Sequence, residues 1–220
     1  MDGAGLDRGA AVGRKRHDPR REATRIALIE AAESLFAEAG VDGVSTRQIG
    51  AAIGSSNTNV VAYHFGSKEA LIEAVYRHRL PAIDGRRREL LDQADSAGTA
   101  GDLSVLVRVF ALPLYEQVDA KGRHSFARFI AGLERSGMMS ARGLLVLDFP
   151  ETERLLARMS TLLPSGTAHA VPQRLRLAVG LIVTALQVID WEKKPGSADA
   201  DDFFDNAVAM AAAAIAAPIS

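Results

Sequence analysis

The chain has 220 residues, a formal net charge of −1 at pH 7 and no cysteine, with 48% hydrophobic and 24% charged residues. This composition is typical of a globular protein and excludes disulfides, thiol catalysis and cysteine-ligated metals. A net charge near zero means that any binding to nucleic acid must rely on local clusters of charge. No signal peptide or apolar run of membrane-spanning length is apparent, so we expect a cytoplasmic protein.

The N-terminal residues divide into an arm and a first helix. Residues 1–18 are rich in glycine and charge, and they are predicted to form a flexible basic arm. A helix is expected from about Arg20, directly after Pro19, to the region of Gly40, because glycine favours a helix end. Its apolar side chains recur at helical spacing, at Leu28, Ala32, Leu35, Phe36 and Ala39.

Two short helices are predicted next. Ser45 followed three residues later by Gln48 has the pattern of a capping box, which predicts a helix over residues 46–53. The glycine and serines at 54–56 interrupt this helix, and a second short helix is expected over residues 57–64. Two short helices joined by a tight, glycine-containing turn are typical of a helix-turn-helix.

Helices this short are not stable alone, so they need a core shared with their neighbours. The small side chains of Ala51 and Ala52 are expected to allow the two helices to cross closely. The expected core members are Phe36, Ile49, Ile53, Val61 and Phe65.

The remainder of the chain is also predicted to be helical. A long helix is expected over residues 67–98, with a kink or break at Pro81, whose ring removes an amide and clashes with the preceding turn. Pro150 is expected to kink or split another helix. No segment alternates as a strand does, so the predicted fold class is all-α. The further predicted helices span about 102–118, 123–136, 140–163, 172–192 and 199–217.

Three segments of the N-terminal part carry a specific pattern: residues 31–40 (AAESLFAEAG), 45–49 (STRQI) and 63–72 (YHFGSKEALI). Together they resemble the TetR family of transcriptional repressors, over about residues 24–80. The resemblance implies an N-terminal three-helix DNA-binding domain and a C-terminal helical domain for ligand binding and dimerisation. The expected regions are the arm (1–18), the helix-turn-helix domain (19–66), the connecting helix (67–98) and the C-terminal domain (99–220).

The resemblance implies a homodimer that binds a palindromic operator as a repressor and is released by a small, mostly apolar effector. We expect the effector to shift the connecting helix about Pro81 and so to change the spacing of the two recognition helices. Two details depart from the family pattern. The turn within residues 55–59 is one residue longer, and Ala62 stands where many members carry a phosphate-contacting tyrosine. Tyr63 is expected to take that role.

The predicted DNA-binding residues combine basic side chains for phosphates with asparagine, serine and threonine for base edges. They are Arg21, Arg25, Thr46, Arg47, Ser55, Ser56, Asn57, Thr58, Asn59, Tyr63, His64 and Lys68. Their simpler interpretation is that the serines and asparagines cap and turn the chain while the charges lie on a solvated surface.

The predicted ligand-binding residues are helix-spaced apolar side chains of the C-terminal domain, and each could instead belong to the core. They are Phe110, Leu114, Phe126, Phe129, Met138, Met139 and Leu145. His124 and Arg128 lie one helical turn apart and are candidates to orient a polar or acidic group of the ligand.

The last two predicted helices are apolar on most faces, which is typical of helices buried on two sides. A second copy of the chain is expected to cover the second side, although burial within one subunit is the alternative. The predicted dimer residues are Leu175, Val179, Ile182, Leu186, Phe203, Val208 and Met210.

No pattern in the sequence indicates catalysis, a metal or a cofactor. The five histidines lack metal-ligand spacing, and no phosphate-binding loop or nucleophile elbow is found. Two other classes stay open. One is a helical DNA-binding protein without a ligand, architectural or regulated by a partner. The other is a helical enzyme or bundle that does not touch DNA, against which the capped helix-turn-helix argues.

Overall fold

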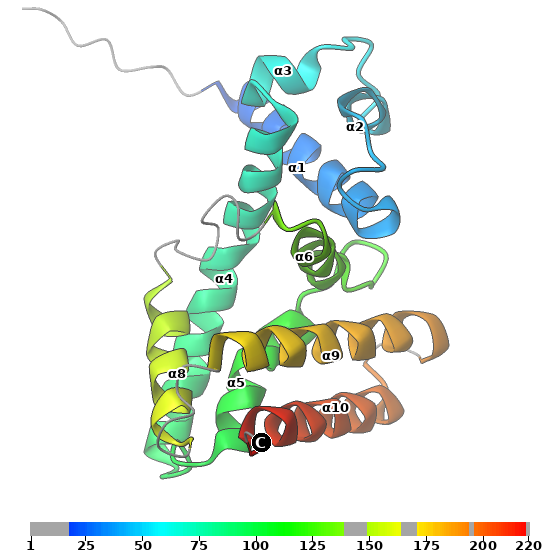
Figure 1. Cartoon of the computed structure of the whole chain (residues 1–220). Coiled ribbons are helices and arrows are strands. Elements are labelled where there is room, and N and C mark those ends of the chain that lie inside the picture. Colours follow the sequence, from blue (N-terminus) through cyan, green and yellow to red (C-terminus); the bar gives the residue numbers. More distant parts are fainter. Residues whose placement is uncertain (1–17, 139–148, 164–170, 194–195, 219–220) are drawn as a thin grey trace, which may run out of the picture.

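The computed structural model describes residues 18–138, 149–163, 171–193 and 196–218, and within these ranges the chain forms helices and no strand. Figure 1 shows α1, α2 and α3 gathered around the N-terminal end of α4, while α9 and α10 lie side by side farther along the molecule. The predicted all-α class is confirmed. The helices are α1 (Pro19–Ala39), α2 (Thr46–Ala52), α3 (Val60–Phe65), α4 (Lys68–Ser96), α5 (Leu103–Glu116), α6 (Ser125–Arg135), α8 (Pro150–Thr161), α9 (Val171–Glu192) and α10 (Ala198–Ala216).

Local hydrogen bonds explain where the two short helices begin. The predicted capping box is present: the Gln48 amide donates to Ser45 Oγ at 3.3 Å, and the Ser45 amide donates to Gln48 Oε1 at 2.8 Å. The predicted start of the next helix at residue 57 is wrong, because α3 begins at Val60. The Asn59 amide donates to Asn57 Oδ1 at 2.9 Å, and this local bond stabilises a turn in place of a helical turn.

Two prolines behave differently from each other. The predicted break at Pro81 is not found, because α4 continues through this residue. Its exposed ring costs the helix one hydrogen bond, while the buried Leu80 and Ile83 on either side hold both halves in the core. Pro150 is the first residue of α8, a position where its missing amide costs nothing. The predicted helix over 140–163 therefore begins at Pro150 within the described residues, and residues 139–148 lie outside them.

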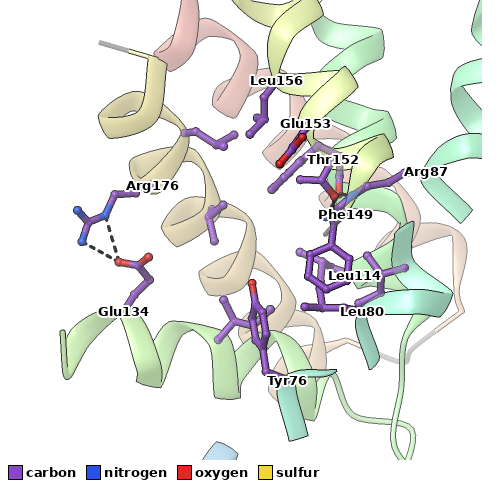
Figure 2. Close-up of a pocket in the computed structure, with 15 residues that line it drawn as sticks. Tyr76, Leu80, Arg87, Leu114, Glu134, Phe149, Thr152, Glu153, Leu156 and Arg176 are labelled. Atoms are coloured by element: carbon purple, nitrogen blue, oxygen red, sulfur yellow. Dashed lines mark hydrogen bonds and ion pairs between the residues drawn. The ribbon is translucent and has the colours of Figure 1, made fainter. Parts of the chain in front are cut away.

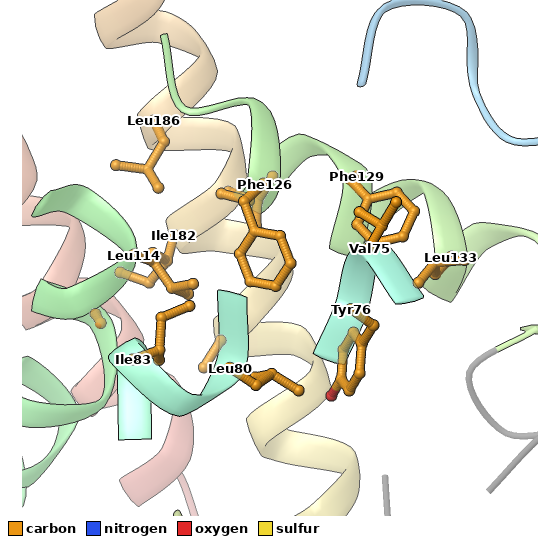
Figure 3. Close-up of a cluster of buried hydrophobic side chains, with 14 of the residues drawn as sticks. Val75, Tyr76, Leu80, Ile83, Leu114, Phe126, Phe129, Leu133, Ile182 and Leu186 are labelled. Carbon is orange, nitrogen blue, oxygen red and sulfur yellow. The ribbon is translucent and has the colours of Figure 1, made fainter. Parts of the chain in front are cut away.

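The core runs without interruption from the N-terminal helices into the C-terminal helices. Of the expected members, Phe36, Ile49 and Val61 are fully buried, while Ile53 and Phe65 are partly buried against them. Figure 3 shows the second part of this core, where side chains of α4, α5, α6 and α9 meet. None of the helices in the described ranges is long and apolar enough to cross a membrane.

A buried polar contact joins the N-terminal helices to the rest of the chain. The Glu33 carboxylate on α1 accepts a bond from Arg79 Nε of α4 at 2.7 Å and another from Ser125 Oγ of α6 at 2.6 Å. Both bonds are charge-assisted, and the Glu33 side chain is only 3% exposed. The contact therefore fixes α1, α4 and α6 relative to one another.

Candidate DNA-binding face and interior cavity

A glycine sets the distance between the two helices of the helix-turn-helix. Gly50 is buried on α2, and a β-carbon at this position would lie 2.9 Å from Val60 Cγ1 of α3. Ala51 and Ala52, which were expected to allow the close crossing, are exposed. The close approach therefore depends on Gly50, which the sequence reasoning missed.

The turn before α3 uses some of its polar side chains internally and leaves others free. Ser55 Oγ accepts a bond from the Asn57 amide at 3.2 Å, and Asn57 Oδ1 accepts one from the Asn59 amide. For Ser55 and Asn57, the simpler interpretation as turn-forming residues therefore holds. The exposed side chains of Ser56, Thr58 and Asn59 make no hydrogen bond to another described residue, so they are available to an external partner.

Basic and aromatic side chains cluster beside this turn. Arg21 of α1 lies over the ring of Tyr63, with its Cζ 5.5 Å from the ring centre, and Arg25 lies over the ring of Phe65 at 4.6 Å. Tyr63 is 65% exposed. Four cations of this face take part in no ion pair with a described residue, namely Arg21, Arg25, Arg47 and Lys68.

His64 lies within the same cluster. Its ring packs edge-on against Tyr63, with 5.0 Å between the ring centres. Partial burial, together with the nearby charges of Arg21 and Arg25, lowers the pKa of His64 below its usual value. The imidazole is therefore mainly neutral at pH 7. An anion beside the two arginines would favour its protonated form.

A cavity of about 170 Å³ opens between α4, α5, α6, α8 and α9, and most of its lining is apolar. Figure 2 shows these side chains converging from the five helices. Polar or charged groups among them include Arg87, Glu134, Thr152 and Arg176. The apolar lining residues include Tyr76, Leu80, Ile83, Phe110, Leu114, Ile130, Phe149, Leu156, Leu175 and Val179.

The predicted ligand-binding residues separate into three groups. Phe110 and Leu114 line the cavity. Phe126 and Phe129 are fully buried in the core and are not among the lining residues, and Met138 packs against that core. Two others lie outside the described residues, namely Met139 and Leu145.

The second pair of predicted ligand contacts is engaged elsewhere. His124 is buried, with Nδ1 2.6 Å from the Asp190 carboxylate and Nε2 3.0 Å from the carbonyl oxygen of Tyr115. Both ring nitrogens of His124 therefore have partners within the chain. Arg128 lies over the ring of Trp191, 5.6 Å from its centre. Neither His124 nor Arg128 lines the cavity.

The predicted dimer residues also occupy different places. Leu175 and Val179 line the cavity. Phe203 and Met210 border a groove between α9 and α10 that is open to solvent. The remaining three are buried within the single chain, namely Ile182, Leu186 and Val208. These three belong to the core of one subunit, in agreement with the alternative that was left open for this surface.

These features define an all-α protein with an N-terminal helix-turn-helix and a larger helical domain behind it. Residues 28–75 match the sequence profile of the bacterial regulatory proteins of the tetR family. The N-terminal domain of this chain is thus similar to the DNA-binding domain of that family. The match supports a transcriptional regulator that binds DNA.

Two solved structures are similar to this chain, and the first of them has the same fold. The structure of "Probable transcriptional regulatory protein RHA5900" is 22% identical, with a TM-score of 0.52, and the match covers 88% of this chain and 100% of that chain. The TetR family transcriptional regulator PfmR from Thermus thermophilus is 18% identical, with a TM-score of 0.48, over 88% of this chain and 99% of that one. A search of curated protein sequences found no match.

Proposed function

We propose that this protein is a ligand-responsive transcriptional repressor, which binds a palindromic operator as a homodimer and is released by a small effector. The observation that carries the DNA-binding part is the face around α2 and α3. There, four cations without an ion-pair partner in the described part of the chain surround a turn with free polar side chains. Unpaired cations on one face are suited to neutralising phosphates.

The groups on this face divide by chemistry. The unpaired cations and the exposed Tyr63 are proposed to contact phosphates, which position the protein on the duplex. Ser56, Thr58 and Asn59 are proposed to contact base edges, because their side chains are not used within the turn. Of the other four predicted contacts, Thr46 and His64 flank this surface, whereas Ser55 and Asn57 hold the turn together.

The proposed dimer surface consists of exposed and half-exposed, mostly apolar side chains on α9 and α10, which we call the α9–α10 stripe. On α9 they recur with alternating spacings of four and three residues, which keeps them on one side of the helix. Leu177 alone is 72% exposed, and a large exposed apolar surface indicates an interaction site. The stripe comprises Leu177, Leu181, Thr184, Val188, Trp191, Phe203 and Met210.

The proposed effector site is the cavity, and α4 is the element that links it to DNA. Lys68 at the start of α4 belongs to the DNA-binding face, whereas Tyr76, Leu80 and Ile83 of the same helix line the cavity. Because α4 is continuous through Pro81, a shift of its cavity-lining part is transmitted to the helix-turn-helix. An effector that prefers the shifted state weakens operator binding by changing the spacing of the two recognition helices, which must match about 34 Å in the major groove.

The test measures binding to a labelled DNA fragment from directly upstream of the protein's own coding region, at several salt concentrations and with random DNA as competitor. Specific binding that survives the competitor supports the proposal. Arg47→Ala is expected to weaken binding and to lower the salt dependence by about one released ion. The matched control is Arg88→Ala, an exposed arginine on α4 away from this face, which should bind as the parent does.

Two results would contradict the proposal. Binding that random DNA abolishes, for the upstream fragment and for a wider set of genomic fragments, would exclude sequence-specific regulation. Specific binding that no small molecule alters would instead favour a DNA-binding protein without a ligand.

A further inference from the structure

The polar groups of the cavity indicate what kind of effector it takes, an inference that rests on the proposed function. Arg87 of α4 lines the cavity and is only 4% exposed. Its guanidinium stacks over the Phe110 ring, 4.4 Å from the ring centre. A cation buried to this degree is costly unless an anion compensates it.

The direct partners of Arg87 are neutral. Nε and Nη2 donate to the carbonyl oxygen of Phe110 at 3.4 and 3.0 Å, and Nη1 donates to Thr152 Oγ1 at 2.7 Å. A guanidinium has five N–H groups, so these three bonds leave two N–H groups without an acceptor among the described residues. Such donors on the wall of a cavity suit an acceptor group of a ligand.

Among the described residues, the negative charge of Asp84 compensates Arg87 only indirectly. Thr152 Oγ1 donates to Asp84 Oδ1 at 2.8 Å, so the hydroxyl stands between the Asp84 carboxylate and the guanidinium. Burial lowers the pKa of Arg87 to about 10, and Asp84 only partly opposes this effect. The guanidinium stays charged at neutral pH and is incompletely compensated.

Tyr76 supplies a second donor to the same cavity. Its side chain is 7% exposed, and Figure 2 shows its hydroxyl pointing into the cavity. The hydroxyl has no hydrogen-bond partner within the described ranges. Burial raises the pKa of Tyr76, so the hydroxyl keeps its proton and can donate it.

The acidic groups of the lining do not offset these donors. The Glu134 carboxylate accepts a bond from Arg176 Nη2 at 2.8 Å, and this pair is visible at the edge of the cavity in Figure 2. Glu153 is exposed to solvent, which screens its charge. The buried end of the cavity is therefore the end that favours an anion.

We propose that the cavity binds a small apolar carboxylic acid, whose carboxylate accepts hydrogen bonds from Arg87 and from the Tyr76 hydroxyl. The volume of about 170 Å³ limits the apolar part, since an apolar cavity of about 150 Å³ holds a benzene molecule. One aromatic ring with a small substituent, or a short aliphatic chain, satisfies this limit.

The experiment compares probes of one size and different charge. Benzoate, 4-methylbenzoate and hexanoate are titrated into the full-length protein by calorimetry, beside benzamide, 4-methylbenzamide and hexanamide and beside benzylamine and hexylamine. The acids are expected to bind at least about tenfold more tightly than the amides, because a charge-assisted bond to a buried guanidinium exceeds a neutral one. The amines are expected not to bind.

Variants assign the binding to these two groups. Arg87→Met is expected to weaken acid binding at least about tenfold, and Tyr76→Phe a few-fold. Arg88→Met is the matched control, because it removes an exposed arginine next in sequence. If Arg87→Met loses its helical circular dichroism, Tyr76→Phe and Arg87→Lys carry the test, with partial binding expected for the lysine. Acid binding that is unchanged in the folded variants, tighter binding of amines, or no binding of any acid would each overturn the proposal.

The calorimetric test is independent of DNA. An acid that binds through Arg87 but leaves operator binding unchanged would support the carboxylate site and contradict the effector role. An effector that releases the operator but carries no carboxylate, and binds equally well to Arg87→Met, would support the proposed function and contradict the carboxylate site.

Discussion

At the scale of single residues, Gly50 shows how a missing side chain positions the DNA-binding helices. The α2 backbone approaches Val60 so closely that a β-carbon at position 50 would require the Val60 side chain or one of the two helices to move. Because α3 has only six residues and Asn59 provides no side-chain cap, its orientation depends on packing against its neighbours.

Gly50→Val is therefore expected to destabilise the protein by about 1–3 kcal/mol and to weaken operator binding, because the larger side chain forces α2 and α3 apart. Ala51→Val is the control, since it places the same side chain on the exposed side of α2. The measurements are urea unfolding and operator affinity. Equal stability of the two variants would show that α2 and α3 do not cross as closely as described.

The surroundings of His64 predict how stability and operator affinity depend on pH. Its pKa in the folded protein is lowered by burial and by Arg21 and Arg25, so the unfolded chain binds the proton more readily. The stability that this residue contributes is therefore present above its usual pKa of about 6.5 and is lost as the pH falls. Phosphate beside the arginines opposes this shift, so operator affinity is expected to rise as the pH falls from about 8 to about 6.

His64→Gln is expected to reduce both pH dependences. The difference between the variant and the parent isolates this residue from the other histidines that titrate in the same range. A parent and a variant with parallel pH profiles of operator affinity would place His64 away from phosphate.

At the scale of elements, sequence reasoning succeeded where the determining partners are neighbours in the chain. The capping box of α2 was predicted because Ser45 and Gln48 lie three residues apart and bond to each other. The start of α3 was predicted too early. Asn57 could begin a helix or hold a turn, and its bond to the Asn59 amide favours the turn. Gly50 escaped notice because its partner, Val60, is known only once the helices are placed.

The same limit explains why the residues that line the cavity were predicted only in part. Helical spacing indicated that Phe126 and Phe129 face the interior, but it does not separate a side chain within the core from one on a cavity wall. Arg87 was missed as a lining residue because the predicted contacts were chosen among apolar side chains. Its spacing of four residues from Ile83 and from Leu91 places it on the buried side of α4, and that signal was present in the sequence.

The contact between α1, α4 and α6 is the clearest link between the two functional regions. Glu33→Gln keeps the shape of the side chain but removes the charge that Arg79 and Ser125 share. This variant is expected to lose about 1–3 kcal/mol of stability, because bonds to a charged group are replaced by weaker ones.

The measurement is urea unfolding of Glu33→Gln, Arg79→Met and the double variant. The double variant is expected to lose less than the sum of the two single losses, since either change alone removes the ion pair. Glu30→Gln, on the exposed side of α1, is the control. Strictly additive losses would mean that the two side chains do not interact in solution.

At the scale of the whole molecule, the α9–α10 stripe is the feature that a single chain does not account for. The core of one subunit already contains Ile182, Leu186 and Val208, so the side chains on the opposite sides of these helices need another partner. In a twofold dimer the stripe of one copy packs against the stripe of the second copy. Every substitution in the stripe therefore appears twice in the interface.

Leu177→Glu combined with Met210→Glu is accordingly expected to dissociate the proposed dimer, because it buries unpaired carboxylates that repel each other. Sedimentation velocity should give a monomer, and operator affinity should fall at least about tenfold, because each half-site is then bound separately. Val118→Glu places the same charge on an exposed apolar residue outside the stripe and should leave the dimer intact. A dimeric double variant would exclude the stripe as the interface. A monomer that binds the operator with unchanged affinity would instead exclude a need for two recognition helices.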